Sequence, residues 1–236
     1  MVDFHSHILP AMDDGCRNIQ ESLTLLKMQA AQGVQTTIAT PHFYATDESV
    51  EKFLTRRKAS AEKLSEILSD DLPKVLLGAE VRYYQGISRL ENLSDLCIEG
   101  TNLLLLEMPV SKWTDYNIRE ILELSGRGDL TLILAHIERY MGYQSHSKWQ
   151  TLEQSDILMQ VNASFFNSLS HRRKALSMLG EQRIQLIGSD CHDPIHRNVH
   201  LGKTYKLIDK KFGSSFVKEL ITFENSLLSI KADARF

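Results

Sequence analysis

Nitrogen and oxygen donors recur at the ends of short apolar segments that are typical of β-strands. Five of the nine histidines and three carboxylates occupy such positions. These residues are His5, His7, His42, Glu80, Glu107, His136, Asp190 and His192. Imidazole and carboxylate without thiolate is a donor set typical of Zn, Mn, Fe(II) or Mg sites. Because eight donors exceed what one ion needs, the pattern predicts a centre of two or three metal ions.

The spacing within two of the motifs supports this hypothesis. Residues two apart on a strand point to the same side, so His5 and His7 can reach one ion together, as can Asp190 and His192. Ser6 and Cys191 would then point away. The loop after the first strand reads Asp13-Asp14-Gly15 and offers a further carboxylate at the same place. Unpaired buried charges cost several kcal/mol each, so unrelated core residues are a poor explanation for the whole set.

Two arginines follow the same strand ends. Arg139 lies in His136-Ile137-Glu138-Arg139-Tyr140, and Arg197 lies in Asp193-Pro194-Ile195-His196-Arg197. A cation beside a metal centre can neutralise a phosphoryl oxygen during its transfer, whereas a surface ion pair is the simpler alternative for each arginine. The four remaining histidines are expected to be solvated; they are His146, His171, His196 and His200.

Strand-like and helix-like segments alternate along the chain. The predicted strands are Val2–His7, Thr36–Thr40, Val75–Val81, Leu103–Glu107, Thr131–His136, Leu158–Asn162 and Ile184–Ser189. The predicted helices are Ile19–Gln32, Ser49–Leu68, Asp115–Ser125, Ser147–Glu153, His171–Leu179, Gly202–Lys211 and one near Ser215–Ile230, with a less well defined helical stretch at Ile87–Leu96. This alternation favours a parallel sheet in an α/β fold.

A closed barrel is favoured over an open doubly wound sheet, because no Gly-x-Gly-x-x-Gly or Walker loop follows any strand. The carboxyl ends of parallel barrel strands meet on one face, where all the candidate ligands would converge. No linker, composition break or internal repeat divides the sequence, so one domain over residues 1–236 is expected.

Composition narrows the class of protein further. The 27 Lys and Arg residues against 30 Asp and Glu residues give a formal net charge of -3, which predicts neither nucleic-acid binding nor binding to an anionic membrane. The longest apolar run, around Leu103–Leu106, is too short to span a bilayer, and no signal peptide is visible. The three cysteines have no Cys-x-x-Cys spacing. A cytoplasmic, water-soluble protein is expected.

One motif points to a different mechanism. Cys191 and Arg197 have the spacing found in cysteine-dependent phosphatases. That chemistry needs a Gly-rich loop whose backbone N–H groups surround the phosphate and lower the pKa of the thiol. Here the intervening residues are His-Asp-Pro-Ile-His, in which proline lacks an N–H and aspartate repels phosphate. The thiolate mechanism is therefore disfavoured.

The sequence resembles the PHP (polymerase and histidinol phosphatase) superfamily, and more closely the bacterial PHP-type protein-tyrosine phosphatases found with capsular and exopolysaccharide genes. The motifs that carry the resemblance are Asp3-Phe4-His5-Ser6-His7-Ile8-Leu9-Pro10, Asp13-Asp14-Gly15, Ala39-Thr40-Pro41-His42, Gly78-Ala79-Glu80, Ala135-His136-Ile137-Glu138-Arg139-Tyr140 and Gly188-Ser189-Asp190-Cys191-His192. They run in order from Met1 to about Arg197.

The resemblance implies a distorted seven-stranded (β/α) barrel with up to three metal ions, commonly manganese. It implies as metal ligands His5, His7, Asp14, His42, Glu80, Glu107, His136, Asp190 and His192, and as phosphate-binding residues Arg139 and Arg197. Ala11 stands where a glycine is frequent in the family, and Cys191 separates the last two ligands, but neither departure removes a donor atom.

The expected function is metal-dependent hydrolysis of a phosphomonoester by an activated water, without a covalent intermediate. The resemblance adds phosphotyrosine on a protein as substrate and an autophosphorylating tyrosine kinase of polysaccharide export as partner. Three alternatives remain open: a small-molecule phosphatase such as histidinol phosphatase, an amidohydrolase-type barrel, and a non-catalytic metal-binding scaffold. The second is disfavoured because strand four ends in Glu107 rather than in a bridging lysine, and the third because every expected donor is present.

Overall fold

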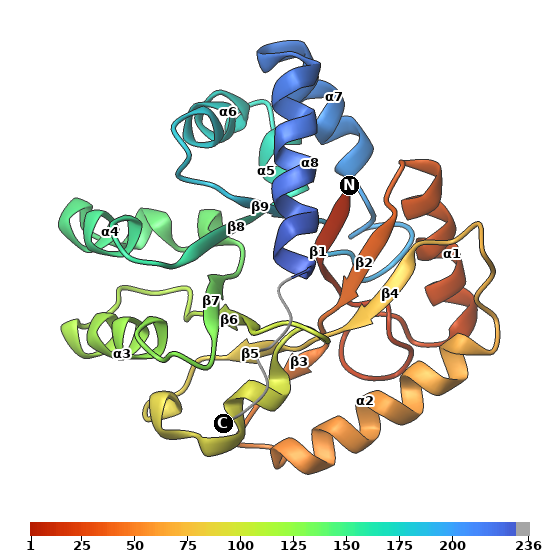
Figure 1. Ribbon diagram of the computed structural model, residues 1–236, viewed down its shortest axis with the longest axis horizontal. Helices are drawn as coiled ribbons and strands as arrows, with labels where there is room; N and C mark the ends of the chain where they lie inside the picture. Colours follow the sequence, from red (N-terminus) through yellow and green to blue (C-terminus); the bar gives the residue numbers. More distant parts are fainter. Residues whose placement is uncertain (230–236) are drawn as a thin grey trace.

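The computed structural model describes residues 1–229, in which parallel strands form a curled central sheet surrounded by helices (Figure 1). The strands are β1 (Val2–Ser6), β2 (Thr36–Ala39), β3 (His42–Phe43), β4 (Lys74–Leu77), β5 (Glu80–Arg82), β6 (Leu103–Glu107), β7 (Thr131–Leu134), β8 (Leu158–Asn162) and β9 (Leu186–Gly188). The α-helices are α1 (Ile19–Ala31), α2 (Val50–Ser65), α3 (Asp115–Ser125), α4 (His146–Glu153), α5 (Ala163–Asn167), α6 (Arg172–Gly180), α7 (Leu201–Phe212) and α8 (Ser214–Leu228). Four short 3₁₀ helices are η1 (Ile87–Arg89), η2 (Glu91–Leu96), η3 (Ile137–Arg139) and η4 (Met141–Tyr143).

The strands form two hydrogen-bonded groups, β1-β2-β4 and β3-β5-β6-β7-β8-β9, and all pairs are parallel. Backbone hydrogen bonds also join the chain at the ends of β1 and β9. The N–H of Asp190 donates to the carbonyl of His5 at 2.7 Å, and the N–H of His7 donates to the carbonyl of Cys191 at 2.9 Å. A Cβ at Gly188 would lie 2.5 Å from the Cβ of His5, so this close approach requires glycine.

Among residues 1–229 the structure has nine strands where seven were predicted, because a short strand, β3, lies beyond the second predicted strand and the third predicted strand is divided. The predicted strand Thr36–Thr40 corresponds to β2, which ends at Ala39. The additional strand β3 begins at His42, after Thr40-Pro41, where proline has no N–H for the ladder. The third predicted strand, Val75–Val81, is interrupted at Gly78-Ala79 and becomes β4 and β5. The prediction of an α/β fold with a parallel sheet is confirmed.

The predicted helices lie close to their observed positions. Asn18 caps α1 by accepting a hydrogen bond from the N–H of Glu21 at 3.0 Å, and Thr114 and Asn117 form a capping box at the start of α3. Two features differ from expectation: Ile87–Leu96 forms η1 and η2 instead of one helix, and the short α5 was not predicted. Of the predicted last helix, Ile230 lies outside the described residues.

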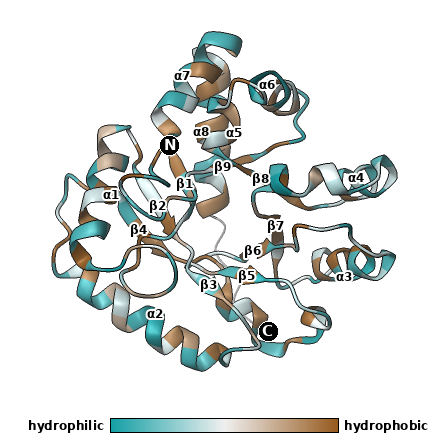
Figure 2. Cartoon of the chain, turned by 180° about the vertical axis from the view of Figure 1, so that it is seen from behind, coloured by the Kyte–Doolittle hydropathy of each residue, from teal (hydrophilic) through white to brown (hydrophobic). Residues whose placement is uncertain are grey.

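The central strands are largely hydrophobic, whereas much of α2 is hydrophilic (Figure 2). The side chains of the strands alternate between two apolar layers. In β6, Leu104 and Leu106 belong to a large apolar layer that includes the helices, whereas Leu103 and Leu105 belong to a smaller cluster. We call this smaller set the inner apolar cluster; its buried members are Val2, Phe4, Ile38, Ile98, Leu103, Leu105, Ile133, Ala135, Leu186 and Leu227. Leu227 comes from α8, so this helix covers the end of the sheet at which β1 begins (Figure 1).

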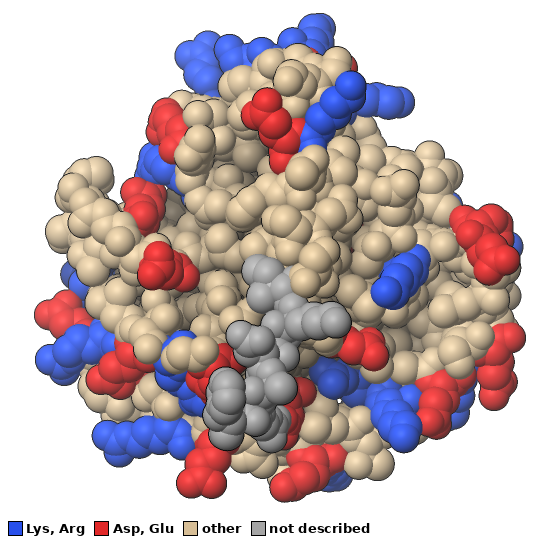
Figure 3. Space-filling model, viewed as in Figure 1, with Lys and Arg blue, Asp and Glu red and all other residues tan. Residues whose placement is uncertain are grey.

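Acidic and basic side chains are interspersed over the face shown in Figure 3, with a group of Lys and Arg side chains at the top. Among residues 1–229, none of the helices has the length and apolar character needed to cross a membrane.

Candidate metal centre

Polar side chains continue the inner face of the sheet beyond the inner apolar cluster. In β6, Glu107 follows Leu103 and Leu105 with a period of two, so the carboxylate lies on the same face as these leucines. In β8, Gln160 and Asn162 follow the same rule, and both are buried. The strands therefore place apolar residues near their beginnings and polar residues near their ends.

Simple alternation does not account for all the ligands. Ile133 and Ala135 face inwards, so His136 would face outwards in a regular strand, but its φ of 30° is left-handed and β7 has already ended at Leu134. At β1, the pairing with β2 shifts register between Asp3 and Ser6, next to His5. Such irregularities redirect side chains and are enriched at functional sites.

The expectation that Asp190 and His192 share a strand face is also wrong. β9 ends at Gly188, and Asp190 has a left-handed φ of 53°. The two side chains nevertheless meet, with His192 Nδ1 3.6 Å from Asp190 Oδ1. The loop backbone, rather than strand alternation, brings them together.

Glu80 is the centre of the cluster. Its Oε2 atom lies 3.1 Å from Nε2 of His5, 3.2 Å from Nε2 of His7 and 3.0 Å from Nδ1 of His42. Its Oε1 atom lies 2.8 Å from Nε2 of His136. Four imidazoles from three segments of the chain, at β1, β3 and the end of β7, thus surround one buried carboxylate.

A second carboxylate, Asp190, extends the cluster. Its Oδ1 atom lies 3.6 Å from Nε2 of His5 and 3.5 Å from Nε2 of His7. Asp14 approaches from the loop after β1, with Oδ1 3.5 Å from Nε2 of His42 and 3.4 Å from Nε2 of His192. Asp14 is the most exposed of these groups, with 64% of its side chain accessible.

Four groups have ligand atoms that all lie within 4.8 Å of one another. They are His7 with Asp14, His42 and His192; His5 with His7 and Asp190; His5 with Glu80 and His136; and His42 with Glu80 and Glu107. Together they contain all nine residues predicted as metal ligands. Several residues belong to two groups, as expected where ligands bridge neighbouring ions.

The arrangement of the donor atoms is explained better by a bound cation than by hydrogen bonds between the donor atoms themselves. Nε2 of His5 and Nε2 of His7 are 3.1 Å apart, a separation typical of two nitrogens bound to one ion at about 2.0–2.1 Å. Among the described residues, Nδ1 of His136 and Nε2 of His192 are buried without a hydrogen-bond partner. Buried polar atoms are rarely left unsatisfied, so these residues fit a metal centre.

The ionisable groups of the cluster shift one another's pKa values. Burial would raise the pKa of Glu80, but the imidazoles of His5, His136 and His7 hold it well below its usual range. Burial would lower the pKa of His7, but Asp13 and Glu80 raise it to about 10. For His192, burial and the neighbouring His7 lower the pKa to about 4. The imidazoles therefore keep Glu80 ionised, the form in which a carboxylate binds a metal.

Both predicted arginines lie at this centre. Arg139 and Arg197 each donate to Oδ2 of Asp190, the latter at 2.9 Å. Asn162 donates to the same oxygen at 2.8 Å. About 36% of the Arg139 side chain and 40% of the Arg197 side chain remain exposed. Asp190 thus faces imidazoles with one oxygen and guanidinium groups with the other.

Three supporting residues were not assigned a role from the sequence. Asp13 accepts from Nδ1 of His7 at 2.7 Å and from the N–H of His42 at 2.9 Å, which orients two candidate ligands. Gln160 accepts from the N–H of His136 at 2.7 Å. Arg82 pairs with Oε2 of Glu107 at 2.6 Å. Two of the three had a sequence signal, because Asp13 lies in the Asp13-Asp14-Gly15 motif and Arg82 is two residues after Glu80.

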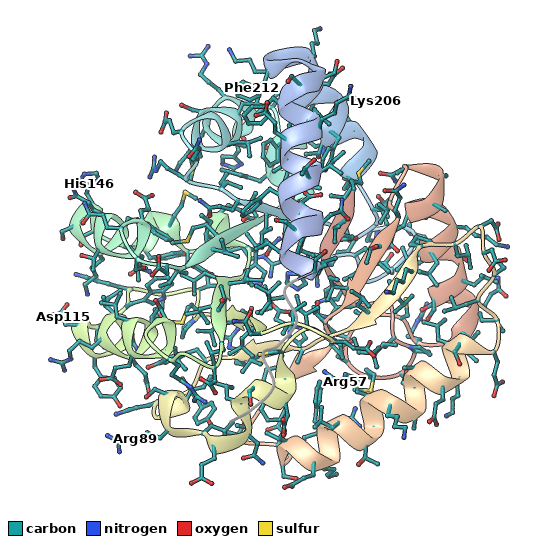
Figure 4. The ribbon with its side chains drawn as sticks, in the orientation of Figure 1. Arg57, Arg89, Asp115, His146, Lys206 and Phe212 are labelled. Atoms are coloured by element: carbon teal, nitrogen blue, oxygen red, sulfur yellow. The ribbon has the colours of Figure 1, made fainter. Side chains whose placement is uncertain are left out.

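The other histidines lie apart from this centre. His146, His171 and His196 are exposed, His200 is partly exposed, and Figure 4 shows His146 at the outer end of α4. Cys191 is fully buried, and burial raises the pKa of its thiol well above the usual value. This environment does not favour a thiolate nucleophile.

A cavity of about 570 Å³ opens beside the centre. Its lining includes Asp13, Asp14, His42 and Tyr44. The ring of Tyr44 lies 5.4 Å from that of His42, and 38% of Tyr44 is exposed. Two of the candidate ligands, Asp14 and His42, are therefore accessible from solvent on the side of β3 and the loop after β1.

Comparison with known proteins agrees with this geometry. A family described as "Capsular polysaccharide synthesis, CpsB/CapC" matches residues 1–230. The tyrosine-protein phosphatase YwqE of Bacillus subtilis is 28% identical over 221 residues, which cover 91% of this chain and 86% of YwqE. The tyrosine-protein phosphatase CpsB of Streptococcus pneumoniae is 29% identical over 241 residues, which cover 93% of this chain and 94% of CpsB.

Solved structures show the same fold. A chain from the crystal structures of YwqE from Bacillus subtilis and CpsB from Streptococcus pneumoniae, described as metal-dependent tyrosine phosphatases, matches with a TM-score of 0.80 at 24% identity. The match covers 98% of this chain and 95% of that chain. A chain of archaeal ribonuclease P with mature tRNA shares the fold with a TM-score of 0.59 at 12% identity, covering 97% of this chain and 90% of that chain.

Proposed function

Because the chain belongs to the CpsB/CapC family of capsular polysaccharide synthesis, we propose that it is a metal-dependent phosphatase that hydrolyses phosphotyrosine on proteins. The observation that carries this proposal is the convergence of four imidazoles on Glu80, with Asp190 beside them. This arrangement suits the binding of cations, and two arginines next to it suit the binding of a phosphoryl group.

The residues that would hold the metal are the nine in the four groups described above, and we propose manganese, with up to three ions. Iron, zinc or magnesium would suit the same nitrogen and oxygen donors. When bound, such ions supply Lewis acidity, which lowers the pKa of a water molecule and neutralises phosphoryl oxygens. Asp13 and Gln160 would keep the donor groups oriented.

The protein's own contribution to phosphate binding comes from Arg139 and Arg197. Their guanidinium groups share Asp190 Oδ2 and remain partly exposed, so they can also donate to a phosphoryl oxygen. Asp190 holds them beside the imidazoles. In this proposal their positive charge stabilises the negative charge that develops on the transferred group. We propose no covalent intermediate, since Cys191 is buried with a raised thiol pKa.

We further propose that the substrate is an autophosphorylating tyrosine kinase of capsule or exopolysaccharide synthesis, and that the reaction takes place in the cytoplasm. The whole chain, residues 1–236, would act as one domain. In this interpretation β2 with β3, and β4 with β5, each form one interrupted strand of a seven-stranded barrel that closes between β9 and β1.

The test is metal analysis of the purified protein together with hydrolysis of p-nitrophenyl phosphate, with and without added Mn²⁺. We expect two or more bound ions per chain and activity that is lost on chelation and restored by Mn²⁺. A comparison of phosphotyrosine peptide with histidinol phosphate then tests the substrate class. Absence of bound metal, or activity unaffected by its removal, would contradict the proposal.

A further inference from the structure

Asp3 in β1 is a fully buried carboxylate to which the proposed reaction gives no role. Its Oδ1 atom accepts hydrogen bonds from the backbone N–H of Ser189 at 2.7 Å and from that of His5 at 3.3 Å. Its Oδ2 atom accepts from the side chain of Gln29 on α1 at 2.7 Å. These donors are neutral groups. Burial of a carboxylate among neutral donors opposes folding, so filling space in the core does not explain this residue.

The contact with His5 lies at the irregular part of β1. In the pairing of β1 with β2, Asp3 lies opposite Thr37. The next pair joins Ser6 to Ala39, so β1 has one residue more than β2 between the two pairs. An extra residue of this kind disrupts the regular hydrogen-bond ladder, and here the N–H of His5 donates to the carboxylate of Asp3.

This irregularity determines the direction in which His5 points. Phe4 belongs to the inner apolar cluster, whereas Asp3 faces α1 and contacts Gln29. A regular strand would turn His5 to the same side as Asp3, because side chains two residues apart share a face. Nε2 of His5 lies instead 3.1 Å from Oε2 of Glu80. The extra residue beside Asp3 therefore directs this candidate ligand into the metal centre.

The contact with Ser189 lies at a second irregularity, at the end of β9. This strand ends at Gly188, and Asp190 has a left-handed φ of 53°, which is a strained conformation for a residue other than glycine. The N–H of Asp190 donates to the carbonyl of His5 at 2.7 Å. Oδ1 of Asp3 thus binds the N–H of His5 and the N–H of the residue that precedes Asp190 at one point.

We propose that Asp3 is a positioning residue of the metal centre, because its carboxylate fixes His5 relative to Asp190 through the backbone. Gln29 in turn orients the carboxylate. This inference rests on the proposed metal-dependent function. His5 and Asp190 belong, with His7, to one group of candidate ligands, so a change in their relative position weakens binding of the ion that they share.

The experiment measures the Mn²⁺ affinity of each purified protein by competition with a chelator, at a temperature at which circular dichroism shows the protein to be folded. Asp3→Ala should bind Mn²⁺ about 10–100-fold more weakly than the wild type. The visible absorption spectrum of Co²⁺ bound in place of Mn²⁺ should also change, because it depends on the geometry of the ligands. Asp3→Asn should retain most of the affinity, because its amide oxygen can still accept from both N–H groups.

Glu224→Ala is the matched control, since Glu224 is also a buried carboxylate that accepts a backbone N–H of β1, that of Val2. It should lower the Tm but leave the Mn²⁺ affinity and the Co²⁺ spectrum as in the wild type. Gln29→Leu keeps the carboxylate of Asp3 but removes the donor that orients it, so it should show a smaller loss of Mn²⁺ affinity.

The positioning role is overturned if folded Asp3→Ala has the Mn²⁺ affinity and Co²⁺ spectrum of the wild type. If Asp3→Ala does not fold, wild-type affinity in Gln29→Leu overturns it. Equal losses of affinity in Asp3→Ala and Asp3→Asn, or in Asp3→Ala and Glu224→Ala, also overturn it. A wild-type protein that binds Mn²⁺, with the expected differences among the variants, but does not hydrolyse p-nitrophenyl phosphate would retain the positioning role and overturn the proposed phosphatase function.

Discussion

Two buried glutamates lie at opposite ends of the inner apolar cluster. At the end where the strands begin, Glu224 of α8 accepts from the N–H of Val2 at 3.1 Å and from the hydroxyl of Tyr205. At the other end, Glu80 faces four imidazoles. Burial raises the pKa of Glu224 to about 7, whereas the imidazoles hold the pKa of Glu80 well below its usual range.

The different neighbours of these two glutamates distinguish a structural carboxylate, Glu224, from a candidate metal ligand, Glu80. Each oxygen of Glu224 has a neutral donor, so the group is satisfied without a cation and joins α8 to β1. Oε2 of Glu80 has three ring nitrogens within 3.2 Å, more than its lone pairs can satisfy through hydrogen bonds. Burial alone therefore does not identify a functional carboxylate; the number and charge of its neighbours do.

The largest effect is expected from Glu80→Gln, which keeps the size of the side chain but removes its charge. Metal content should fall, and hydrolysis of p-nitrophenyl phosphate should decrease by ~10³-fold or more, because the shared ligand is lost. Asp190→Ala and His136→Ala should behave in the same way. Inductively coupled plasma mass spectrometry and steady-state kinetics measure both properties. Glu224→Gln is the matched control and should retain metal and activity; equal losses in both variants would contradict the distinction.

An intermediate effect on activity is expected from substitution of Arg139 and Arg197, which lie at the same end of the inner apolar cluster as Glu80. Arg139→Ala should keep the metal but lower kcat/KM by ~10²-fold, as when one preorganised donor is removed. Lysine at this position should restore only part of the loss, because a point charge cannot reproduce the planar two-pronged contact. Arg197→Ala should show a smaller decrease.

Inorganic phosphate provides the control for the arginine variants. It should inhibit the wild type competitively and both alanine variants less strongly, while chelator sensitivity stays the same. If Arg139→Ala hydrolyses phosphotyrosine at nearly the wild-type rate with normal phosphate inhibition, Arg139 serves only as the ion-pair partner of Asp190.

A smaller effect, on stability rather than activity, is expected at the opposite end. Because the pKa of Glu224 in the folded state is raised to about 7, its ionised form is disfavoured by folding. The contribution of protonated Glu224 to the free energy of unfolding is complete below about pH 4.3, the pKa of a glutamate in the unfolded chain. This contribution is lost as the pH rises through about 7. The unfolding free energy of the wild type should therefore fall relative to Glu224→Gln between pH 5 and pH 8, by on the order of 1–3 kcal/mol.

Urea unfolding of both proteins at several pH values measures this difference, and subtraction removes the titration of groups common to both. A difference that does not change with pH would mean that Glu224 has the same pKa in the folded and unfolded states.

The smallest effect is expected from Cys191→Ser. This side chain is buried, and its neighbours Asp190 and His192 supply the donors of the centre. The serine variant should retain most of the phosphatase activity and its full metal content. A loss of activity with metal content intact would revive the thiolate mechanism that the spacing of Cys191 and Arg197 raises.

Sequence periodicity predicted the bounds of helices and strands well where the local sequence preference agrees with the tertiary packing. α3 has the predicted bounds, because its capping residues Thr114 and Asn117 are specified locally. The two-residue strand β3 was missed because it is too short to show a period. The division of the third strand at Gly78 was missed because apolar residues continue on both sides of the break. The short α5 was missed for a related reason: five residues are too few to show helical periodicity.

The sequence by itself determined which residue types are available at the strand ends, and a period of two was enough to direct Glu107 inwards. Only the tertiary structure decided the orientation of His5 and His136, which depends on a register shift in β1 and a left-handed residue after β7. The roles of Asp13, Gln160 and Arg82 likewise come from contacts between separate segments. Local pattern encodes which face a regular strand buries, but irregular backbone and long-range contacts are set by how the strands close around one another.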